Sequence, residues 1–417
     1  MTIKMRVLFV TNFYPPKQRG GYEEWCQEIA QQFLDNGHDV RVLTSKYLGS
    51  DQVNDPDYVS RTLNLEMDIA SLSNAIRFFT HRQKRIDESK AAVDETISHF
   101  RPDSVLIWGM WNIPRDIPAY IEMLLPGRVA YYLGDYWPSL PPQFKNYWEA
   151  KPSNWIKGIP KAILSAPAKA ILSRETPAKL DLSVGIFCSN YLKDKLEQQE
   201  ICFKSNHIVY GAIDTRPYQT IAKTRQPSSN KVIHLLSLGR IIPDKGVKTI
   251  ILAINELVQV GITDVGLNIV GSGDPVYELD LKNLVKEMQL EGFVVFNGSV
   301  DKTKVPELYA ESDIFVFASV WPEPFGRVII EAMASGVAVV GTSVGGAAEL
   351  LDNNVNALTF TPGSEVELAQ KLETLIKDKA KKASLIKKGL SDAAQNYDIT
   401  RMFQEIELIL SRLTQRA

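Results

Sequence analysis

The chain has 417 residues, 45% hydrophobic and 23% charged, which is the composition of a globular protein, and its length predicts two or more domains. A formal net charge of −2 gives no reason to expect a nucleic-acid partner. Cys26, Cys188 and Cys202 have no metal or disulfide spacing and no apolar run approaches about 18 residues, so we expect a cytoplasmic protein without a membrane span.

The chain opens with a βαβ pattern. Apolar residues 6–11 predict a buried strand, a helix is predicted from Tyr22 to Asn36, and residues 38–44 predict a second strand. The loop before the helix contains Gly20-Gly21 and lies at the carboxyl end of a strand, where open parallel sheets bind ligands. Glycines there let the backbone approach a ligand or adopt a positive φ, although an ordinary turn also explains the pair. We expect His38, which follows the helix, to be structural.

The rest of the first half alternates between helical and strand patterns. Polar residues 49–62 predict a loop, and 74–100 predict one long helix with a basic cluster. Strands are predicted at 102–108, 128–133, 183–189 and 208–210. The second of these ends in Gly134-Asp135, where the Asp135 carboxylate could contact a ligand at the strand end or could stabilise its own loop.

Residues 151–180 are basic, with Glu175 as the single acid and apolar residues interleaved. An apolar face flanked by lysines is typical of a helix that lies on a membrane surface. Pro160 and Pro167 should break such a helix into short pieces, so a lid or hairpin packed on the domain is the alternative.

The second half begins after a polar linker at about 220–230. The strand 232–238 runs into Gly239-Arg240, and Lys245 precedes the next predicted helix. Arg240 offers a planar charged fork and Lys245 a mobile point charge, so together they suit a diphosphate. The alternative is two exposed surface cations.

The most informative stretch is residues 321–336. A strand at 314–318 leads into a proline-containing loop, then into a buried helix closed by Gly336, then into a strand at 337–340. The helix start, with Gly326 beside it, favours an anion. The carboxylates of Glu323 and Glu331 would repel a phosphate and should face hydroxyls, so the pattern predicts a nucleotide-sugar. On one helix the two carboxylates would lie roughly 12 Å apart, whereas the paired carboxylates of glycosidases lie roughly 5–9.5 Å apart. The spacing therefore favours two binding roles over a hydrolase.

This stretch resembles the signature of the family 4 glycosyltransferases, which are retaining enzymes of the GT-B fold. The resemblance rests on Glu323-Pro324-Phe325-Gly326 and on Glu331-Ala332-Met333-Ala334 followed by Gly336. It implies that Glu323 binds donor-sugar hydroxyls, that Glu331 binds the ribose, and that Arg240 and Lys245 neutralise the diphosphate and the leaving group. The other implied donor contacts are Gly20, Gly21, Gly239, Gly271, Val300, Phe325, Gly326, Arg327 and Val328.

One departure of the first half from the family lies at a strand end facing the expected cleft. Family members commonly carry His-Asp where this chain has Gly134-Asp135, and the histidine lines their active site. A histidine contact is therefore in doubt, and we take Asp135 as a catalytic candidate together with Glu323, Arg240 and Lys245.

The resemblance also implies the organisation of the molecule. We expect two Rossmann-like, doubly wound α/β domains facing a cleft: residues 1–215 with a returning helix at 398–417 on the acceptor side, and residues 216–397 for the nucleotide-sugar. The expected reaction is transfer of a sugar from a UDP-sugar to a hydroxyl acceptor, such as a lipid-linked or polysaccharide intermediate, without a metal or other cofactor. The enzyme would work in the cytoplasm, at the inner face of the membrane if residues 151–180 contact it. The alternatives are a GT-B nucleotide-sugar epimerase and a non-catalytic nucleotide-sugar-binding subunit.

Overall fold

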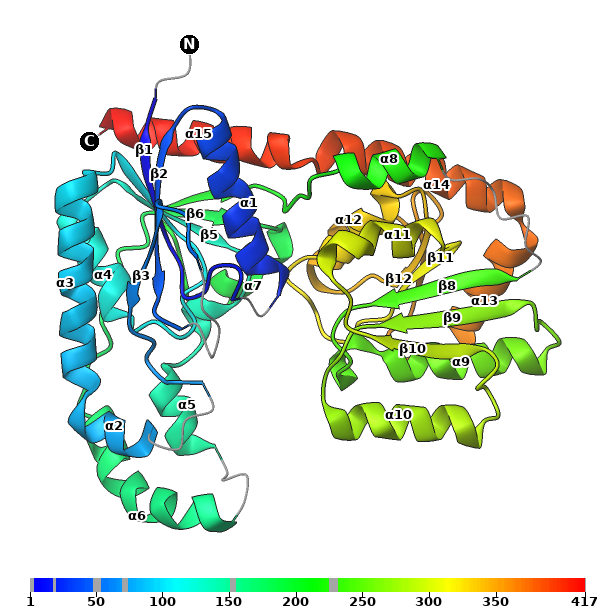
Figure 1. The fold of residues 1–417 in the computed structure, drawn as a ribbon, viewed down its shortest axis with the longest axis horizontal. Helices are drawn as coiled ribbons and strands as arrows, with labels where there is room; N and C mark the ends of the chain where they lie inside the picture. The colour runs from blue at the N-terminus through cyan, green and yellow to red at the C-terminus, as the bar shows by residue number, and fades with distance from the viewer. Residues whose placement is uncertain are drawn as a thin grey trace. The chain divides into compact units, whose positions relative to one another are not determined.

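The computed structural model describes residues 4–17, 20–47, 54–69, 74–150, 155–224 and 232–416. The chain divides into two compact units: an N-terminal unit of Met1–Val209 with Phe403–Ala417, and a C-terminal unit of Tyr210–Met402. The sequence predicts these boundaries at 215 and 397, a few residues from the observed divisions. The last helix, α15 (Ile399–Arg416), begins in the C-terminal unit and continues into the N-terminal one (Figure 1).

The N-terminal unit is built on a parallel sheet of seven strands in the order β3-β2-β1-β4-β5-β6-β7. Helix α1 lies on one face of this sheet, and α3 and α4 lie on the other (Figure 1), as right-handed crossovers require. Because both faces are covered, the central strands are continuous apolar runs with almost no exposure. The strands are β1 Arg6–Val10, β2 Asp39–Ser45, β3 Val59–Leu63, β4 Ser104–Ile107, β5 Val129–Leu133, β6 Val184–Phe187 and β7 Ser205–Ile208.

The helices of this unit are α1 Gly21–Asp35, α2 Asn74–Thr80, α3 Arg82–Phe100, α4 Asp116–Leu124, η1 Trp137–Ser139, α5 Gln143–Glu149, α6 Trp155–Leu172 and α7 Asn190–Glu197. Helix α15 joins them from Phe403 onward, and the ring of Phe403 packs edge-on against Phe33 of α1 at 4.9 Å. His38 is structural, as expected: it is buried, accepts a bond from the Met5 N–H through Nδ1, and lies 2.9 Å from Glu407 through Nε2.

Three predictions for this unit are wrong. The loop predicted at 49–62 contains the start of edge strand β3, which pairs in parallel with β2 although its own pattern is polar. The single helix predicted at 74–100 is two helices, α2 and α3, interrupted at His81. Helix α6 is continuous through both prolines, because each proline removes only one backbone hydrogen bond and packing can offset that loss.

Helix α6 packs on the unit through a small apolar cluster that includes Ala168 and the aromatic side chains of Phe78, Phe144 and Trp148. This contact fits the packed hairpin that the sequence left open. Ile163 and Ile171 of α6 are exposed. The predicted membrane contact lies partly outside the described residues, which omit 151–154 and the side chains of 155–160 and 162.

The C-terminal unit has six parallel strands in the order β10-β9-β8-β11-β12-β13. Helices α9 and α10 cover one face and α11 and α12 the other (Figure 1). The strands are β8 Ile233–Leu238, β9 Val265–Val270, β10 Val294–Gly298, β11 Ile314–Phe317, β12 Ala338–Thr342 and β13 Leu358–Phe360. The helices are α8 Arg216–Thr224, η2 Pro243–Lys245, α9 Val247–Gln259, α10 Pro275–Glu287, η3 Lys302–Lys304, α11 Val305–Ala310, α12 Arg327–Ala334, η4 Gly345–Glu349, α13 Glu365–Lys377 and α14 Lys379–Asn396.

The strand order of this sheet reverses between β8 and β11, which are neighbours although two strands separate them in sequence. Such a switch point leaves an opening at the carboxyl ends of the two strands, where open α/β sheets bind ligands. The predicted Lys245 loop follows β8, and the predicted Glu323 loop follows β11.

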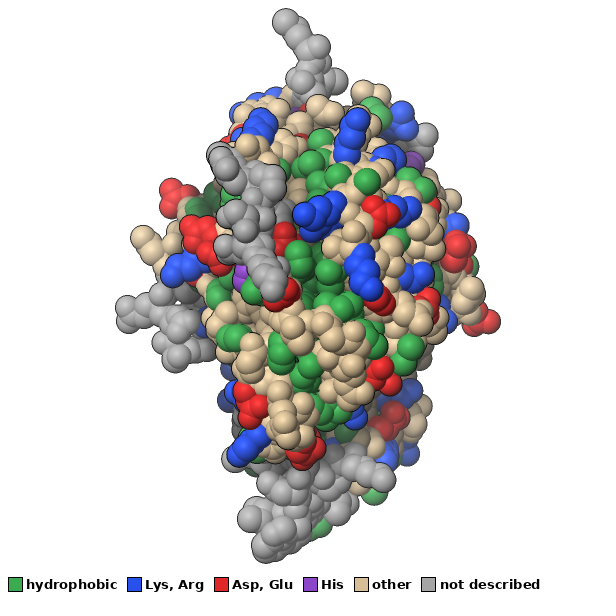
Figure 2. Space-filling model, turned by 90° about the vertical axis from the view of Figure 1, so that its right-hand side faces the viewer, with side chains coloured by type: hydrophobic (Ala, Val, Ile, Leu, Met, Phe, Trp, Pro, Cys, Tyr) green, Lys and Arg blue, Asp and Glu red, His purple; other side chains and the backbone are tan. Residues whose placement is uncertain are grey.

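The surface carries both signs of charge. On the face in Figure 2, blue and red side chains are interspersed among small apolar patches, in keeping with the near-neutral total charge. Among the described helices, none is both long enough and apolar enough to cross a membrane.

Candidate functional site

The loop after β8 is folded tightly against the end of β11. Gly246 has a φ of +67°, and a Cβ there would lie 2.0 Å from the Ala318 carbonyl oxygen, so only glycine fits. The Val320 N–H and the Ser319 hydroxyl both donate to the Asp244 carbonyl, at 2.9 and 3.1 Å. These contacts fix the position of Lys245 relative to the segment that carries Glu323.

Two residues predicted for the site are in direct contact. The Lys245 ammonium lies 2.7 Å from the Glu323 carboxylate, and the two side chains are only 24% and 13% exposed. A partly buried pair of this kind holds both groups in a fixed orientation.

The Glu323 loop is held from its other side by η4. The Gly346 N–H donates to the Glu323 carbonyl at 2.7 Å. Gly345 has a φ of +60°, and a Cβ there would lie 2.4 Å from the same carbonyl oxygen. The turn at Gly345-Gly346 therefore braces the backbone of Glu323.

Helix α12 begins directly after this loop. Its N-cap is Gly326, which has no side chain to cap the first N–H groups. Gly326 is buried, and a Cβ there would lie 2.6 Å from Ile329 Cδ1. The first turn of α12, which includes Arg327 and Val328, can therefore present backbone amides and the positive end of the helix dipole to an anion.

Glu331 lies within α12 and is 6% exposed. The Tyr309 hydroxyl lies 3.0 Å from the Val328 carbonyl oxygen and 3.3 Å from one oxygen of the Glu331 carboxylate, and Arg327 Nε lies 3.4 Å from the other. Burial, followed by the charge of Glu331, raises the pKa of Tyr309 well above its usual value, so the phenol stays protonated and can donate. Tyr309 was not predicted from the sequence, since nothing in its helical pattern marks it as more than a core residue.

The carboxyl ends of β8, β9 and β10 meet around two of the predicted glycines. The Gly239 N–H donates to the Val270 carbonyl at 3.0 Å, and the Gly271 N–H donates to the Gly298 carbonyl at 2.7 Å. Gly271 has a φ of +137°, and a Cβ there would lie 1.8 Å from the Gly239 carbonyl oxygen. Val300 is half-buried just after β10, and Arg240 is exposed just after β8.

Phe325 is buried beside residues that the sequence did not predict. Its ring stacks on Tyr210 at 6.3 Å, and the Tyr210 hydroxyl donates to Glu349 at 2.9 Å. The aromatic pair and its acid support the loop just before α12.

The N-terminal unit holds the remaining predicted residues, Gly20, Gly21 and Asp135. Gly20 is extended, with a φ of −178°, so the positive φ considered for it is wrong. A Cβ on Gly20 would meet nothing within 4 Å, so the backbone there is open to close approach. The Gly20 N–H donates to Glu23 at 3.1 Å, which closes the start of α1.

Gly134 stands against the ring of Tyr22. A Cβ at this position would lie 2.6 Å from two ring carbons, so a histidine cannot fit unless Tyr22 moves. The Tyr22 hydroxyl donates to the Tyr132 carbonyl at 2.5 Å, which holds the ring there. The Tyr22 ring therefore fills the space that a side chain at position 134 would need.

Asp135 is half-buried and accepts a bond from the Trp137 N–H at 3.2 Å, so the loop-stabilising role is observed. Burial raises the pKa of Asp135 to about 7, the Trp137 bond opposes that rise, and the charge of Glu23 adds to it. A carboxyl group that titrates near neutral pH can exchange a proton with a bound hydroxyl. Among the described residues, no three His, Cys, Asp or Glu side chains are grouped so as to hold a metal ion.

Comparison with known proteins gives consistent results. The family described as "Glycosyl transferases group 1" matches residues 219–392. The uncharacterized glycosyltransferase MJ1607 of Methanocaldococcus jannaschii is 30% identical over 430 aligned residues, which cover 96% of each chain. The sulfoquinovosyl transferase SQD2 of Arabidopsis thaliana is 23% identical, over 91% of this chain and 68% of its own.

Solved structures share the fold. Anabaena Alr3699/HepE in complex with UDP and glucose has a TM-score of 0.67 and 23% identity, over 98% of this chain and 99% of that one. A glycosyltransferase from Rickettsia africae has a TM-score of 0.70 and 18% identity, over 99% of this chain and 100% of that one. The fold is GT-B: two Rossmann-like α/β units, as predicted.

Proposed function

We propose that this chain, which belongs to the group 1 glycosyltransferases, is a retaining enzyme of the family 4 type that moves a sugar from a UDP-sugar to a hydroxyl acceptor. The observation that carries the proposal is the 2.7 Å contact between Lys245 and Glu323, in a loop that ends at the uncapped start of α12. A cation, a carboxylate and a cluster of amides in one place suit the junction between a sugar and a diphosphate.

Each group would have its own task. The diphosphate would lie against the first turn of α12, with Lys245 and Arg240 neutralising it. Glu331, held by Tyr309, would accept bonds from the ribose hydroxyls, and Glu323 from those of the sugar. The backbone near Gly271 and Val300 would border the base.

Catalysis would come from charge that grows on the departing phosphate as the glycosidic bond breaks. Lys245, Arg240 and the α12 amides would bind this charge more tightly in the transition state than in the ground state. Retention would follow from attack on the face that the leaving group occupies, with the donor phosphate taking the acceptor proton. Transfer would need no divalent metal, because the cations of the chain replace it.

The acceptor would bind to the N-terminal unit. Asp135, with a pKa near neutrality, is suited to contact an acceptor or sugar hydroxyl, and the open backbone at Gly20-Gly21 is suited to a close approach. We propose an acceptor that is a lipid-linked or polysaccharide intermediate, modified in the cytoplasm at the inner face of the membrane. The choice of UDP is supported by the neighbour whose structure holds UDP and glucose.

The test combines binding with transfer. We expect UDP and one UDP-sugar to raise the melting temperature, since a ligand that binds only the folded state stabilises it by mass action. We expect transfer to an acceptor panel without added metal, and a product whose anomeric configuration, followed by NMR, matches the donor. Isomerisation of the donor without an acceptor would instead indicate an epimerase. Donor binding without turnover on any acceptor would indicate a binding subunit.

A further inference from the structure

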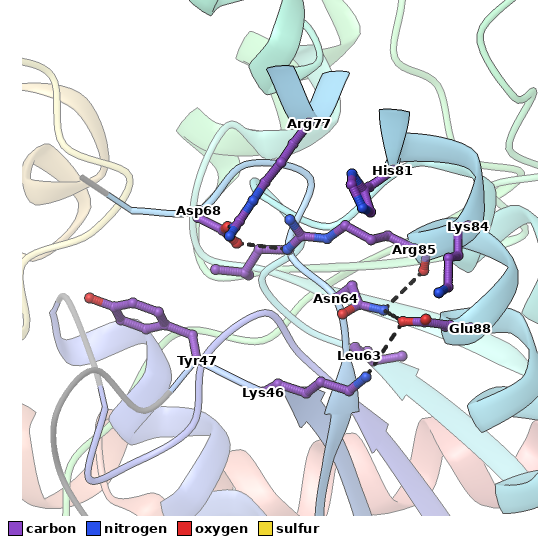
Figure 3. Close-up of a pocket in the computed structure, with 11 residues that line it drawn as sticks. Lys46, Tyr47, Leu63, Asn64, Asp68, Arg77, His81, Lys84, Arg85 and Glu88 are labelled. Atoms are coloured by element: carbon purple, nitrogen blue, oxygen red, sulfur yellow. Dashed lines mark hydrogen bonds and ion pairs between the residues drawn. The ribbon is translucent and has the colours of Figure 1, made fainter. Parts of the chain in front are cut away.

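The N-terminal unit contains a cavity of about 630 Å³ at the carboxyl ends of β2 and β3, and none of the residues assigned above lines it. Its size falls within the range of small-molecule sites. Segments after β2 and β3 form one side, and α2 and α3 form the other (Figure 3). It is lined by the cations Lys46, Arg77, Lys84 and Arg85, the acids Asp68 and Glu88, and the neutral or titratable Tyr47, Leu63, Asn64, Leu65 and His81.

One carboxylate serves both arginines. Asp68 forms an ion pair with Arg77 through Oδ2, and it lies 2.7 Å from Arg85 Nη2 through Oδ1. Figure 3 shows both guanidinium groups pointing toward it from α2 and α3. Each guanidinium carries five N–H donors, so most of their donors remain available to a second anion.

Arg85 is the more buried of the two. Its side chain is 19% exposed, and its Nε is buried without a hydrogen-bond partner among the described residues. Burial lowers the pKa of Arg85, so this cation has given up water without full replacement of its bonds. An anion in the cavity would supply the missing acceptor.

Glu88, the second acid of the cavity, is hydrogen-bonded to an amide and not to a cation. Glu88 accepts a bond from Asn64 Nδ2 at 3.0 Å, whereas Lys46 Nζ is 3.8 Å away, beyond hydrogen-bond length. Lys84 is exposed on the same helix and has no ion pair within the part of the chain that the structure describes. The cavity thus has more positive than negative charge and several unused donors.

We propose that this cavity binds a phosphate group carried by the acceptor. The inference rests on the proposed function and deepens it, because it gives the acceptor a chemical class. A phosphate offers several acceptor oxygens to the two guanidinium groups and to Lys84, and the remaining volume would hold a sugar ring or another polar group of similar size. The phosphate belongs either to a soluble sugar phosphate or to a lipid-linked one.

Calorimetric titration of the full chain, with UDP saturating the donor site, tests the proposal with glucose 6-phosphate and glucose as probes. We expect only the phosphate to bind, and Arg77→Gln/Lys84→Gln to weaken it roughly tenfold or more, the scale of one lost charge-assisted hydrogen bond. Lys90→Gln is the matched control: it removes a cation from α3 that does not line the cavity, and it should leave the affinity unchanged.

A second arm identifies the source of the phosphate. Phosphatidylcholine vesicles with and without phosphatidic acid replace the sugar phosphate. Binding that requires phosphatidic acid and is lost in the double variant, but not in Lys90→Gln, would assign the cavity to a lipid-linked phosphate. If the double variant and the control bind both probes equally while UDP still binds, the cavity proposal is overturned and the donor site is unaffected. If the wild-type chain does not bind UDP, the proposed function is overturned instead.

Discussion

The contact between Gly134 and Tyr22 predicts a specific pattern of stabilities. In Gly134→Ala, the new methyl group would lie 2.6 Å from two ring carbons of Tyr22, well inside van der Waals contact. Tyr22 cannot move away freely, because its hydroxyl is bonded to the Tyr132 carbonyl. Overpacking of this kind costs about 1–3 kcal/mol, so we expect Gly134→Ala to lower the free energy of unfolding by that amount.

The same substitution should be almost neutral once the ring is gone. Tyr22→Ala will itself be destabilising, so the informative quantity is the coupling between the two changes. We expect the double variant to be more stable than the sum of the single effects, by about 0.5–3 kcal/mol. Urea unfolding of all four proteins, followed by a probe in the N-terminal unit, measures this coupling.

Gly20→Ala provides the matched control, since its Cβ would meet nothing and its φ suits any residue. That substitution should be neutral or stabilising by up to about 1 kcal/mol, through the unfolded state. Equal losses in Gly134→Ala with and without the Tyr22 ring would refute the steric explanation of the missing histidine.

The remaining predictions concern the proposed site. Lys245→Ala should reduce transfer by on the order of 10²–10³, whereas Lys248→Ala, an exposed cation three residues on, should not; equal rates for the two would count heavily against the assignment. Tyr309→Phe should weaken UDP binding roughly threefold to tenfold by releasing Glu331, as measured by calorimetry, while dTDP, which lacks the ribose 2′-hydroxyl, should be less affected. The pKa of Asp135 is raised to about 7 in the folded state, whereas in the unfolded chain it is about 3.9, so between these values the unfolded state is ionised first and is favoured. The free energy of unfolding, measured relative to Asp135→Asn, should therefore fall as the pH rises from about 4 to 7. A difference in urea midpoint that stays constant over that range would exclude a raised pKa.

Sequence periodicity was sufficient for the buried central strands and for the βαβ unit around α12, because both faces of such sheets are covered and their strands are continuous apolar runs. It did not predict β13, and it placed the strand β7 at 208–210 rather than at Ser205–Ile208. It failed at β3, where the strand is polar and its pairing with β2 supplies the stability. It also failed at α6, because local propensity penalises proline without registering the packing that compensates.

In the candidate site, too, some residues could be predicted from the sequence and others only from the structure. Lys245 and Glu323 could be proposed from motif and charge alone, although nothing in the spacing shows that the two side chains touch. Tyr309, Tyr22 and Tyr210 could not be found, since an aromatic residue in an apolar pattern is indistinguishable from core until its hydroxyl has a partner. Their roles depend on contacts between segments far apart in the chain.

These tyrosines share one physical property, which is that each directs its hydroxyl at a partner far away in the sequence. Tyr309 holds the Glu331 carboxylate, and Tyr210 holds Glu349 beneath the loop of Phe325. Tyr22 occupies the space that a side chain at position 134 would need. Since ordering a side chain on binding costs about 0.5–1.5 kcal/mol, carboxylates fixed before the donor arrives leave more of the binding energy for the transition state.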